Sequence, residues 1–192
     1  MIINKKYNCI LYLDEAHAMG IYGRNGFGIS SDRQNFNEIV VGTFSKGLGS
    51  FGSFVSCSKD FHKIIVNTCG GLIYSTVLPP SILGSIFAAL KKIPNASKLR
   101  KKLKDNSDFL LKNLKRLDYN TSQSNSHIIP LILESHFKCK KLHKYLFECG
   151  FYVKEVRPPT VPVGQNRIRL SLTATMNRNT IDNFINQLSN FE

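Results

Sequence analysis

A lysine that follows directly after a short apolar strand is the feature that most constrains this chain. Residues 40–47, with the sequence VVGTFSKG, run from β-branched residues into a turn that contains Lys46. About thirty residues earlier, a second apolar run ends in the sequence DEAH at residues 14–17. Short runs rich in Ile, Val and Phe, closed by glycine or polar residues, are typical of buried strands in a mixed or parallel sheet. The sequence therefore predicts two buried strands with reactive side chains at their ends.

These two strand ends carry the groups that a pyridoxal phosphate cofactor needs. The ε-amine of Lys46 can form an imine with the aldehyde of the cofactor, and the hydroxyls of Thr43 and Ser45 can donate to its phosphate. The carboxylate of Asp14 can face the ring nitrogen and keep it protonated. The ring can then accept the electron pair left behind when a substrate Cα bond breaks. The residues thus predict pyridoxal phosphate chemistry and no metal site.

Four motifs resemble, in the same order, those of the α-oxoamine synthase family of pyridoxal phosphate enzymes. They are LDEAHAMG at residues 13–20, GTFSKG at 42–47, YSTVLPP at 74–80 and RPPTVP at 157–162. The resemblance runs from about Lys6 to the C-terminus. It covers only about half the length of a family member, so the chain resembles a C-terminal half.

The resemblance implies an α/β fold, that of a fold-type I pyridoxal phosphate transferase. The chain would hold the second half of the large domain at residues 1–79, a connecting helix at 80–93 and a small C-terminal α+β domain at 94–192. Apolar periodicity and turn residues give the expected elements. Strands are expected at 8–13, 38–43, 52–56, 127–133, 151–156 and 167–172, and helices at 80–92, between 91 and 116, at 138–148 and at about 179–188.

Three residues match the catalytic positions of the family. Lys46 matches the lysine that bonds to the cofactor, Asp14 matches the partner of the ring nitrogen, and His17 matches the residue near the phenolic oxygen of the cofactor. Each has an ordinary structural alternative. A lysine after a strand is most often on the surface, an aspartate at a strand end often caps a turn, and a histidine there is often an ordinary hydrogen-bonded side chain.

Four hydroxyl-bearing residues match positions that bind the cofactor phosphate. Thr43 and Ser45 match ligands within the same subunit. Ser75 and Thr76 match residues that reach the phosphate of the neighbouring subunit's cofactor. The resemblance therefore implies a homodimer in which the active site forms at the interface.

The substrate residues lie in the last third of the chain. Three prolines fix φ in the loop at residues 157–162, which suits it to hold Thr160 against a substrate. Further on, the alternation of strand side chains places Arg167 and Arg169 on one face. By the family match, Arg169 pairs with the carboxylate of the amino-acid substrate and Arg167 is structural. The alternative is that both arginines only solvate an edge strand.

The resemblance implies a decarboxylative condensation of L-alanine with a pimeloyl thioester, carried by coenzyme A or by an acyl carrier protein. Glycine or serine with another acyl-coenzyme A is the alternative within the family. We expect the 192-residue chain by itself to be inactive. A non-catalytic remnant of such an enzyme is a further alternative.

Two other motif readings are disfavoured, because the motifs that would accompany them do not occur in this chain. The sequence DEAH also occurs in nucleic-acid helicases, but the chain lacks the Gly-x-x-x-x-Gly-Lys-Ser/Thr loop that cradles nucleotide phosphates. Residues 47–52, GLGSFG, have the spacing of a dinucleotide-binding turn, yet a strand rather than a helix is expected after them. We therefore expect no nucleic-acid partner.

The charge and the cysteines point to a cytoplasmic protein with one unusually basic segment. The formal net charge is +13, and residues 91–116 contain ten Lys or Arg against two Asp. Leucines at helical spacing predict an amphipathic helix there, with a solvated basic face or, alternatively, a landing surface for an anionic partner. The five cysteines lack Cys-x-x-Cys spacing, which suggests neither a zinc cluster nor a disulfide framework. No apolar run is long enough to predict a membrane span.

Overall fold

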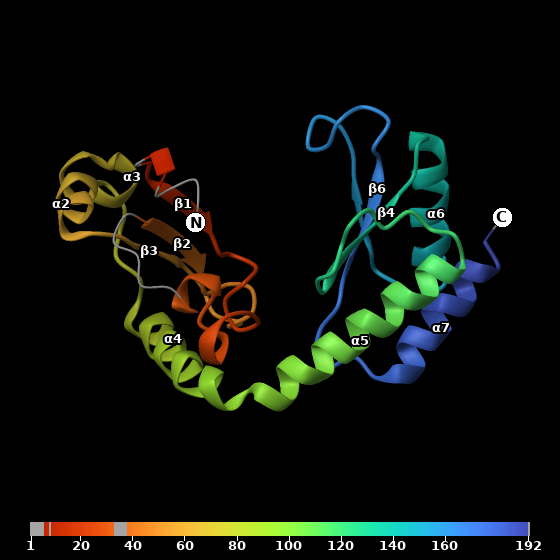
Figure 1. Cartoon of the computed structure of the whole chain (residues 1–192), viewed down its shortest axis with the longest axis horizontal. Helices are drawn as coiled ribbons and strands as arrows, with labels where there is room; N and C mark the ends of the chain where they lie inside the picture. The colour runs from red at the N-terminus through yellow and green to blue at the C-terminus, as the bar shows by residue number, and fades with distance from the viewer. Residues whose placement is uncertain (1–5, 8, 33–37, 192) are drawn as a thin grey trace. The chain divides into compact units, whose positions relative to one another are not determined.

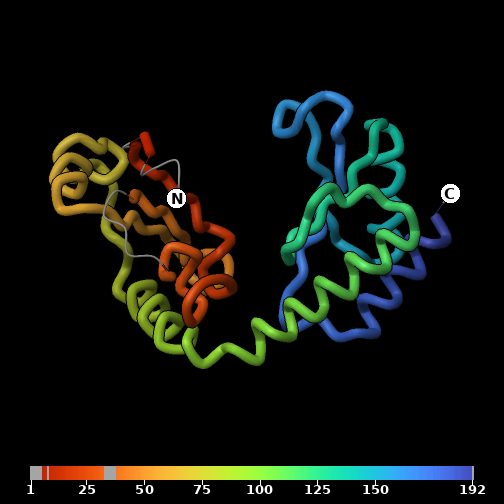
Figure 2. The backbone as a smooth tube through the Cα atoms, viewed as in Figure 1, coloured from red at the N-terminus to blue at the C-terminus, as the bar shows by residue number. Residues whose placement is uncertain are grey.

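The computed structural model describes residues 6, 7, 9–32 and 38–191. The chain divides into two compact units, residues 1–97 and 98–192, each with its own sheet and helices (Figures 1 and 2). The expected divisions at residues 79 and 93 stay a prediction.

The first unit is built on a three-stranded mixed sheet in the order β1-β2-β3. Strands β1 (Leu11–Asp14) and β2 (Glu38–Thr43) are parallel, and β3 (Ser53–Ser56) pairs antiparallel with β2. The expected mixed sheet is confirmed, and β2 has the bounds expected from the sequence. On β2 every second residue is buried, so Val40 packs into the interior while Val41 lies on the half-exposed face.

Short helices complete the first unit. Two 3-10 helices, η1 (Arg24–Gly26) and η2 (Ile29–Asp32), follow β1, and three α-helices, α2 (Lys59–Thr68), α3 (Gly70–Ile73) and α4 (Pro80–Lys92), follow β3. The sequence did not predict α2 or α3. Helix α2 starts at a Ser58 cap, whose hydroxyl accepts a hydrogen bond from the Phe61 N–H. Helix α4 has the expected bounds because a proline at its first position already has a helical φ.

Several helices of the first unit leave apolar side chains on the surface. Helices α2 and α3 bury none of their residues, and α4 buries only Ile86. Ile64, Leu72 and Phe87 are all more than half exposed. Exposed apolar surface of this kind is typical of regions that contact further protein.

The second unit is an antiparallel three-stranded sheet with three helices. Its strands β4 (Ile128–Ile132), β6 (Arg167–Ser171) and β5 (Lys154–Val156) lie in the order β4-β6-β5. Helices α5 (Ser97–Arg116) and α7 (Arg178–Ser189) run side by side (Figure 1), and α6 (His136–Glu148) contacts β5 and β6. The expected α+β arrangement is therefore present. The strand expected at 151–156 is shorter, because Phe151 turns inward and packs edge-on against Phe184 of α7.

The basic segment is not one continuous helix. The short 3-10 helix η3 (Ile93–Asn95) separates α4 from α5, since Pro94 cannot donate a helical hydrogen bond. On α5, the Lys101 and Lys104 amines each lie 2.7 Å from the aspartate four residues on. These two pairs offset part of the positive charge of α5, and the choice between a solvated face and a landing surface stays a prediction.

The core of the second unit joins its sheet to its helices. Leu114 of α5, Ile129 and Leu131 of β4, Leu142 of α6 and Ile168 of β6 have no exposed surface. Leucines three or four positions apart on α5 give that helix one apolar face, and this face meets the sheet. Burial of this face is what holds the long basic helix in place.

Replacing Leu114 with alanine should therefore destabilise the second unit strongly. A fully buried leucine truncated to alanine costs about 2–5 kcal/mol in the free energy of unfolding, because apolar contacts are lost and a cavity remains. Leu99→Ala is the matched control on the same helix, since Leu99 is 54% exposed, and it should cost less than about 0.5 kcal/mol. Urea unfolding followed by circular dichroism measures both, and equal costs would contradict the packing described.

Candidate active site

The parallel pairing of β1 with β2 brings the DEAH segment next to the lysine turn. Asp14 is the register partner of Val41, and the Glu15 N–H donates to the Val41 carbonyl at 2.7 Å. Both strands therefore end at the same edge of the sheet. The chain continues into His17 after β1 and into Lys46 after β2.

Lys46 and His17 are in direct contact at this edge. The Lys46 Nζ lies 3.0 Å from the His17 Nε2, and both side chains are exposed. An imidazole nitrogen without its proton accepts a hydrogen bond from the ammonium group. The structure thus joins two of the three predicted catalytic residues across 29 positions of sequence.

Asp14 has the turn-capping contact that was the alternative to a cofactor role. Its Oδ1 accepts a hydrogen bond from the Ala16 N–H at 2.9 Å. The side chain is exposed. A carboxylate can accept several hydrogen bonds, so this contact orients Asp14 without using up its acceptor capacity. The contact of Asp14 with a cofactor ring stays a prediction.

Thr43 and Ser45 form a connected pair at the end of β2. The Thr43 hydroxyl donates to the Gly52 carbonyl at 2.9 Å and lies 2.8 Å from the Ser45 hydroxyl. Because Thr43 has a single hydroxyl proton, Ser45 is the donor between the two when Thr43 bonds to Gly52. Both protons then point into the turn, and rotation of the hydroxyls would present them to a phosphate.

Ser75 and Thr76 lie on an exposed segment after α3. The Ser75 hydroxyl donates to the Gly71 carbonyl, and the flanking Tyr74 is 89% exposed. Among the described residues no hydrogen bond joins Ser75 or Thr76 to the lysine turn. Their predicted contact with a second subunit stays a prediction.

The predicted substrate residues belong to the second unit. Ile168 and Leu170 of β6 are buried while Arg167 and Arg169 lie on the opposite, half-exposed face, which confirms the expected alternation. Arg167 donates to the side chain and carbonyl of Gln165 at 2.9 and 3.0 Å, as befits a structural residue. Thr160 is exposed, and its N–H donates to the Arg157 carbonyl at 3.1 Å.

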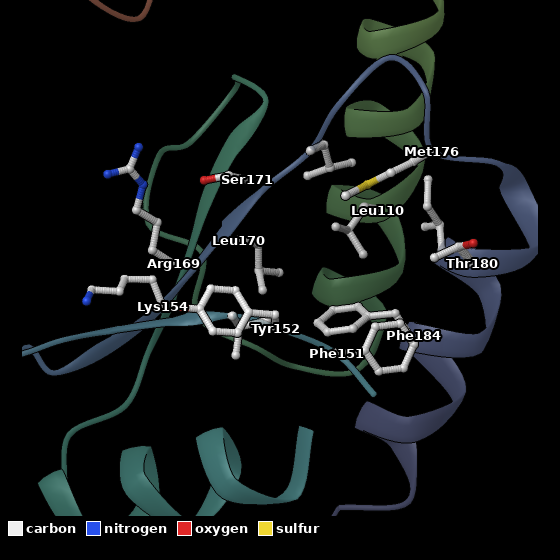
Figure 3. A pocket seen from close by; sticks show the side chains of 13 residues that line it. Leu110, Phe151, Tyr152, Lys154, Arg169, Leu170, Ser171, Met176, Thr180 and Phe184 are labelled. Carbon is white, nitrogen blue, oxygen red and sulfur yellow. The ribbon is translucent and has the colours of Figure 1, made fainter. Parts of the chain in front are cut away.

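Arg169 lines a cavity of about 240 Å³ within the second unit. Figure 3 shows the rings of Phe151 and Phe184 together with Leu110 at its apolar end, and Arg169 and Lys154 at the other. Lys154 is the direct cross-strand partner of Arg169. Like charges directly opposite each other destabilise a sheet, so an anion is favoured at this end. The sequence analysis missed Lys154, because the pairing of β5 with β6 cannot be read from either strand alone.

The positive charge of Arg169 affects the pKa of a nearby histidine, His127. Burial lowers the pKa of the His127 imidazole below its ordinary value of 6.5, and the Arg169 guanidinium lowers it further. His127 lies just before β4, and its carbonyl accepts the Leu172 N–H at 3.0 Å. The electrostatic effect of the Arg169 guanidinium therefore extends to the residue before β4.

The described part of the chain offers neither a cluster of metal ligands nor a membrane-spanning helix. Residues 6, 7, 9–32 and 38–191 contain no group of three or more side chains that could hold a metal ion. In the same residues, no helix combines the length and apolarity that a membrane crossing needs.

Comparison with known proteins shows the family to which this chain belongs. A family model described as aminotransferase class I and II matches residues 1–188. The chain belongs to this family. A protein of Desulfosudis oleivorans is 42% identical over 176 residues, which cover 92% of this chain and 45% of the relative. The 8-amino-7-oxononanoate synthase of Gluconacetobacter diazotrophicus is 37% identical over 95% of this chain and 46% of its own length.

Solved structures of the same family share the fold. A serine palmitoyltransferase with pyridoxal phosphate as the internal aldimine aligns with a TM-score of 0.88 and 29% identity, over 98% of this chain and 48% of that protein. The 8-amino-7-oxononanoate synthase of Francisella tularensis aligns with a TM-score of 0.83 and 29% identity, over 94% and 54%. The predicted α-oxoamine synthase resemblance, the fold-type I class and the cofactor class are thereby confirmed. The chain spans about half the length of these relatives.

The coupling between Arg169 and His127 gives a testable pH dependence. Replacing Arg169 with methionine removes the charge, so the pKa of His127 should rise toward 6.5 while burial still holds it lower. As the pH falls, His127 becomes protonated near pH 6.5 in the unfolded chain but only at a lower pH in the folded chain. The free energy of unfolding therefore falls as the pH drops below 6.5, and less steeply in the variant. An NMR titration of His127 measures the pKa; Arg167→Met is the control, and an unchanged pKa in the Arg169 variant would refute the coupling.

Proposed function

We propose that this chain carries the lysine-bearing part of an 8-amino-7-oxononanoate synthase, which condenses L-alanine with a pimeloyl thioester. The observation that carries the proposal is the contact of Lys46 with His17 at the edge where β1 and β2 end. The synthases among the relatives support the choice within the family.

The residues at this edge fit the chemistry of pyridoxal phosphate. Lys46 supplies an exposed amine, Asp14 an exposed carboxylate, and Thr43 and Ser45 two hydroxyls that can turn toward a phosphate. When bound, the cofactor supplies an electron sink that stabilises a carbanion at the substrate Cα. Asp14 would hold the proton on the ring nitrogen and His17 would orient the Lys46 amine. Lys46 would then take the proton from the alanine Cα as general base.

Arg169 would bind the carboxylate of the amino acid in this proposal. It is half-exposed on β6, with Lys154 opposite it, so two cations frame one end of the cavity. A guanidinium can form two parallel hydrogen bonds with a carboxylate, which fixes the orientation of the substrate. Thr160 and the rigid loop at 157–162 would contact the same substrate. The exposed apolar helices of the first unit are consistent with a homodimer.

The serine palmitoyltransferase structures support a second candidate within the family. They align over 98% of this chain, and that enzyme's name specifies serine and a palmitoyl group. The two candidates differ in the amino acid that displaces Lys46. Titration of the cofactor-loaded protein with alanine, glycine and serine separates them, because the preferred amino acid changes the cofactor absorbance at the lowest concentration.

The proposal predicts where pyridoxal phosphate attaches. Incubation of the purified chain with the cofactor, followed by borohydride reduction, should fix one pyridoxyl group on Lys46, because its exposed amine lies at the end of β2 beside His17. Peptide mapping by mass spectrometry locates the label among the many lysines of the chain. Lys46→Ala is the control and should leave no stoichiometric label. A stoichiometric label on another lysine would remove the basis of the proposal.

Arg169→Ala should weaken binding of alanine to the cofactor-loaded protein. A hydrogen bond between charged groups contributes about 1.5–3 kcal/mol, which corresponds to roughly a ten- to hundredfold higher dissociation constant. Arg167→Ala, two residues earlier on the same face, is the matched control because its guanidinium is engaged by Gln165. The amino-acid titration measures both. Equal weakening by the two variants would rule out the specific pairing.

A further inference from the structure

Glu15 is the most deeply buried acidic side chain at the edge of the candidate site, and the proposed chemistry does not use it. Only 3% of its surface is exposed, although Asp14 and His17 on either side of it are exposed. Its Oε1 accepts a hydrogen bond from the Ser30 N–H at 2.5 Å. Its Oε2 has no hydrogen-bond partner among the described residues. A buried carboxylate is costly unless it is paired or hydrogen-bonded, so the contacts of Glu15 indicate its role.

The Glu15 carboxylate fits against one glycine of the following loop. We name residues 18–31 the glycine loop, since all four of its glycines have a positive φ. A Cβ on Gly28 would lie 1.6 Å from the Glu15 Oε2. The backbone of Gly28 therefore forms the wall of the pocket that holds the carboxylate. Together with the bond to Ser30, this contact ties the far end of the glycine loop to the end of β1.

Backbone hydrogen bonds connect the two sides of the glycine loop. The Gly20 N–H donates to the Gly26 carbonyl at 2.8 Å, and the Gly28 N–H donates to the Tyr22 carbonyl at 2.9 Å. Met19 and Phe27 form an isolated antiparallel bridge. A displacement of Gly28 therefore reaches the near end of the loop, at Met19, through these backbone connections.

The near end of the glycine loop packs on the lysine turn. A Cβ on Gly47 would lie 2.3 Å from the Met19 carbonyl oxygen, so the two backbones are in close contact next to Lys46. The Glu15 carbonyl also accepts the N–H groups of Ala18 and Met19, at 2.8 and 3.2 Å. His17 lies between these anchored positions and has its ring 3.0 Å from the Lys46 amine.

We propose that Glu15 is a positioning residue, whose side chain holds the glycine loop in the shape that brings His17 against Lys46. The inference rests on the proposed function for one point only, which is the purpose of the contact between His17 and Lys46. The role depends on the shape of Glu15 and on one acceptor oxygen. The proposal assigns no role to the negative charge, because the Ser30 N–H needs only one acceptor oxygen.

Four variants separate positioning from general stability. Glu15→Gln keeps the shape and the acceptor for Ser30, whereas Glu15→Asp keeps the charge but is one methylene too short. Gly28→Ala leaves Glu15 in place and displaces its carboxylate by the added Cβ. Gly150→Ala is the control for backbone strain, because Gly150 has φ +84°, close to the +91° of Gly28, and no atom within 4 Å of an added Cβ.

The first measurement needs no cofactor. The ring nitrogen resonances of His17 are recorded by NMR in the ¹⁵N-histidine-labelled full chain and assigned through their absence in His17→Gln. The spectrum of Lys46→Met defines the state in which the contact is lost. Glu15→Asp and Gly28→Ala should shift the His17 resonances toward that state, while Glu15→Gln and Gly150→Ala should leave them as in the parent protein. The other four histidines report any general change.

The second measurement is the amount of pyridoxal phosphate that borohydride fixes on Lys46. It should fall about fivefold in Glu15→Asp and Gly28→Ala, as expected for the loss of one hydrogen bond, and stay unchanged in Glu15→Gln. Parent-like His17 resonances in both Glu15→Asp and Gly28→Ala would overturn the inference, as would equal shifts in Gly150→Ala. An unlabelled Lys46 in the parent protein would overturn the proposed function instead, since the NMR comparison does not involve the cofactor.

Discussion

The pairing of β1 with β2 is the constraint on which the candidate site depends. The two strands are parallel and in register, so Asp14 lies beside Val41 and both chains leave the sheet at one edge. Any slip by one residue would turn every side chain of β1 to the other face. The burial of alternate residues on β2 opposes such a slip. The contact of Lys46 with His17 is a consequence of this register.

Glycines at this edge allow neighbouring groups to approach the backbone closely. Gly42, Gly47 and Gly28 each sit where a side chain would collide with a neighbour at 2.5 Å or less. The approach of the Met19 carbonyl to Gly47 lets the glycine loop and the lysine turn lie against each other. The exposed lysine and histidine therefore stand on a rigid base, which is what a site needs if its geometry is to be set before a ligand arrives.

The second unit makes its contribution by a different route. There the antiparallel pairing of β6 with β5 sets Arg169 opposite Lys154 on the half-exposed face, while Ile168 and Leu170 anchor the strand in the core. The same core fixes α5, on which two of the lysines, Lys101 and Lys104, pair with aspartates one turn away. Under the proposed function, the positive charge that would meet a carboxylate is this cross-strand pair rather than the more conspicuous basic helix.

The amino-acid sequence by itself determined the fold class, the family and the identities of the reactive side chains. Strand β2 and helix α4 were predicted with their observed bounds, because β-branched alternation and an N-terminal proline act locally. Helices α2 and α3 were missed, since their apolar residues face outward and bury nothing. Only the tertiary structure decided that Lys46 meets His17, that Asp14 caps its own turn, that Lys154 faces Arg169 and that Glu15 is enclosed by Gly28. Each of these depends on strand register or loop closure between residues that the sequence alone does not bring together.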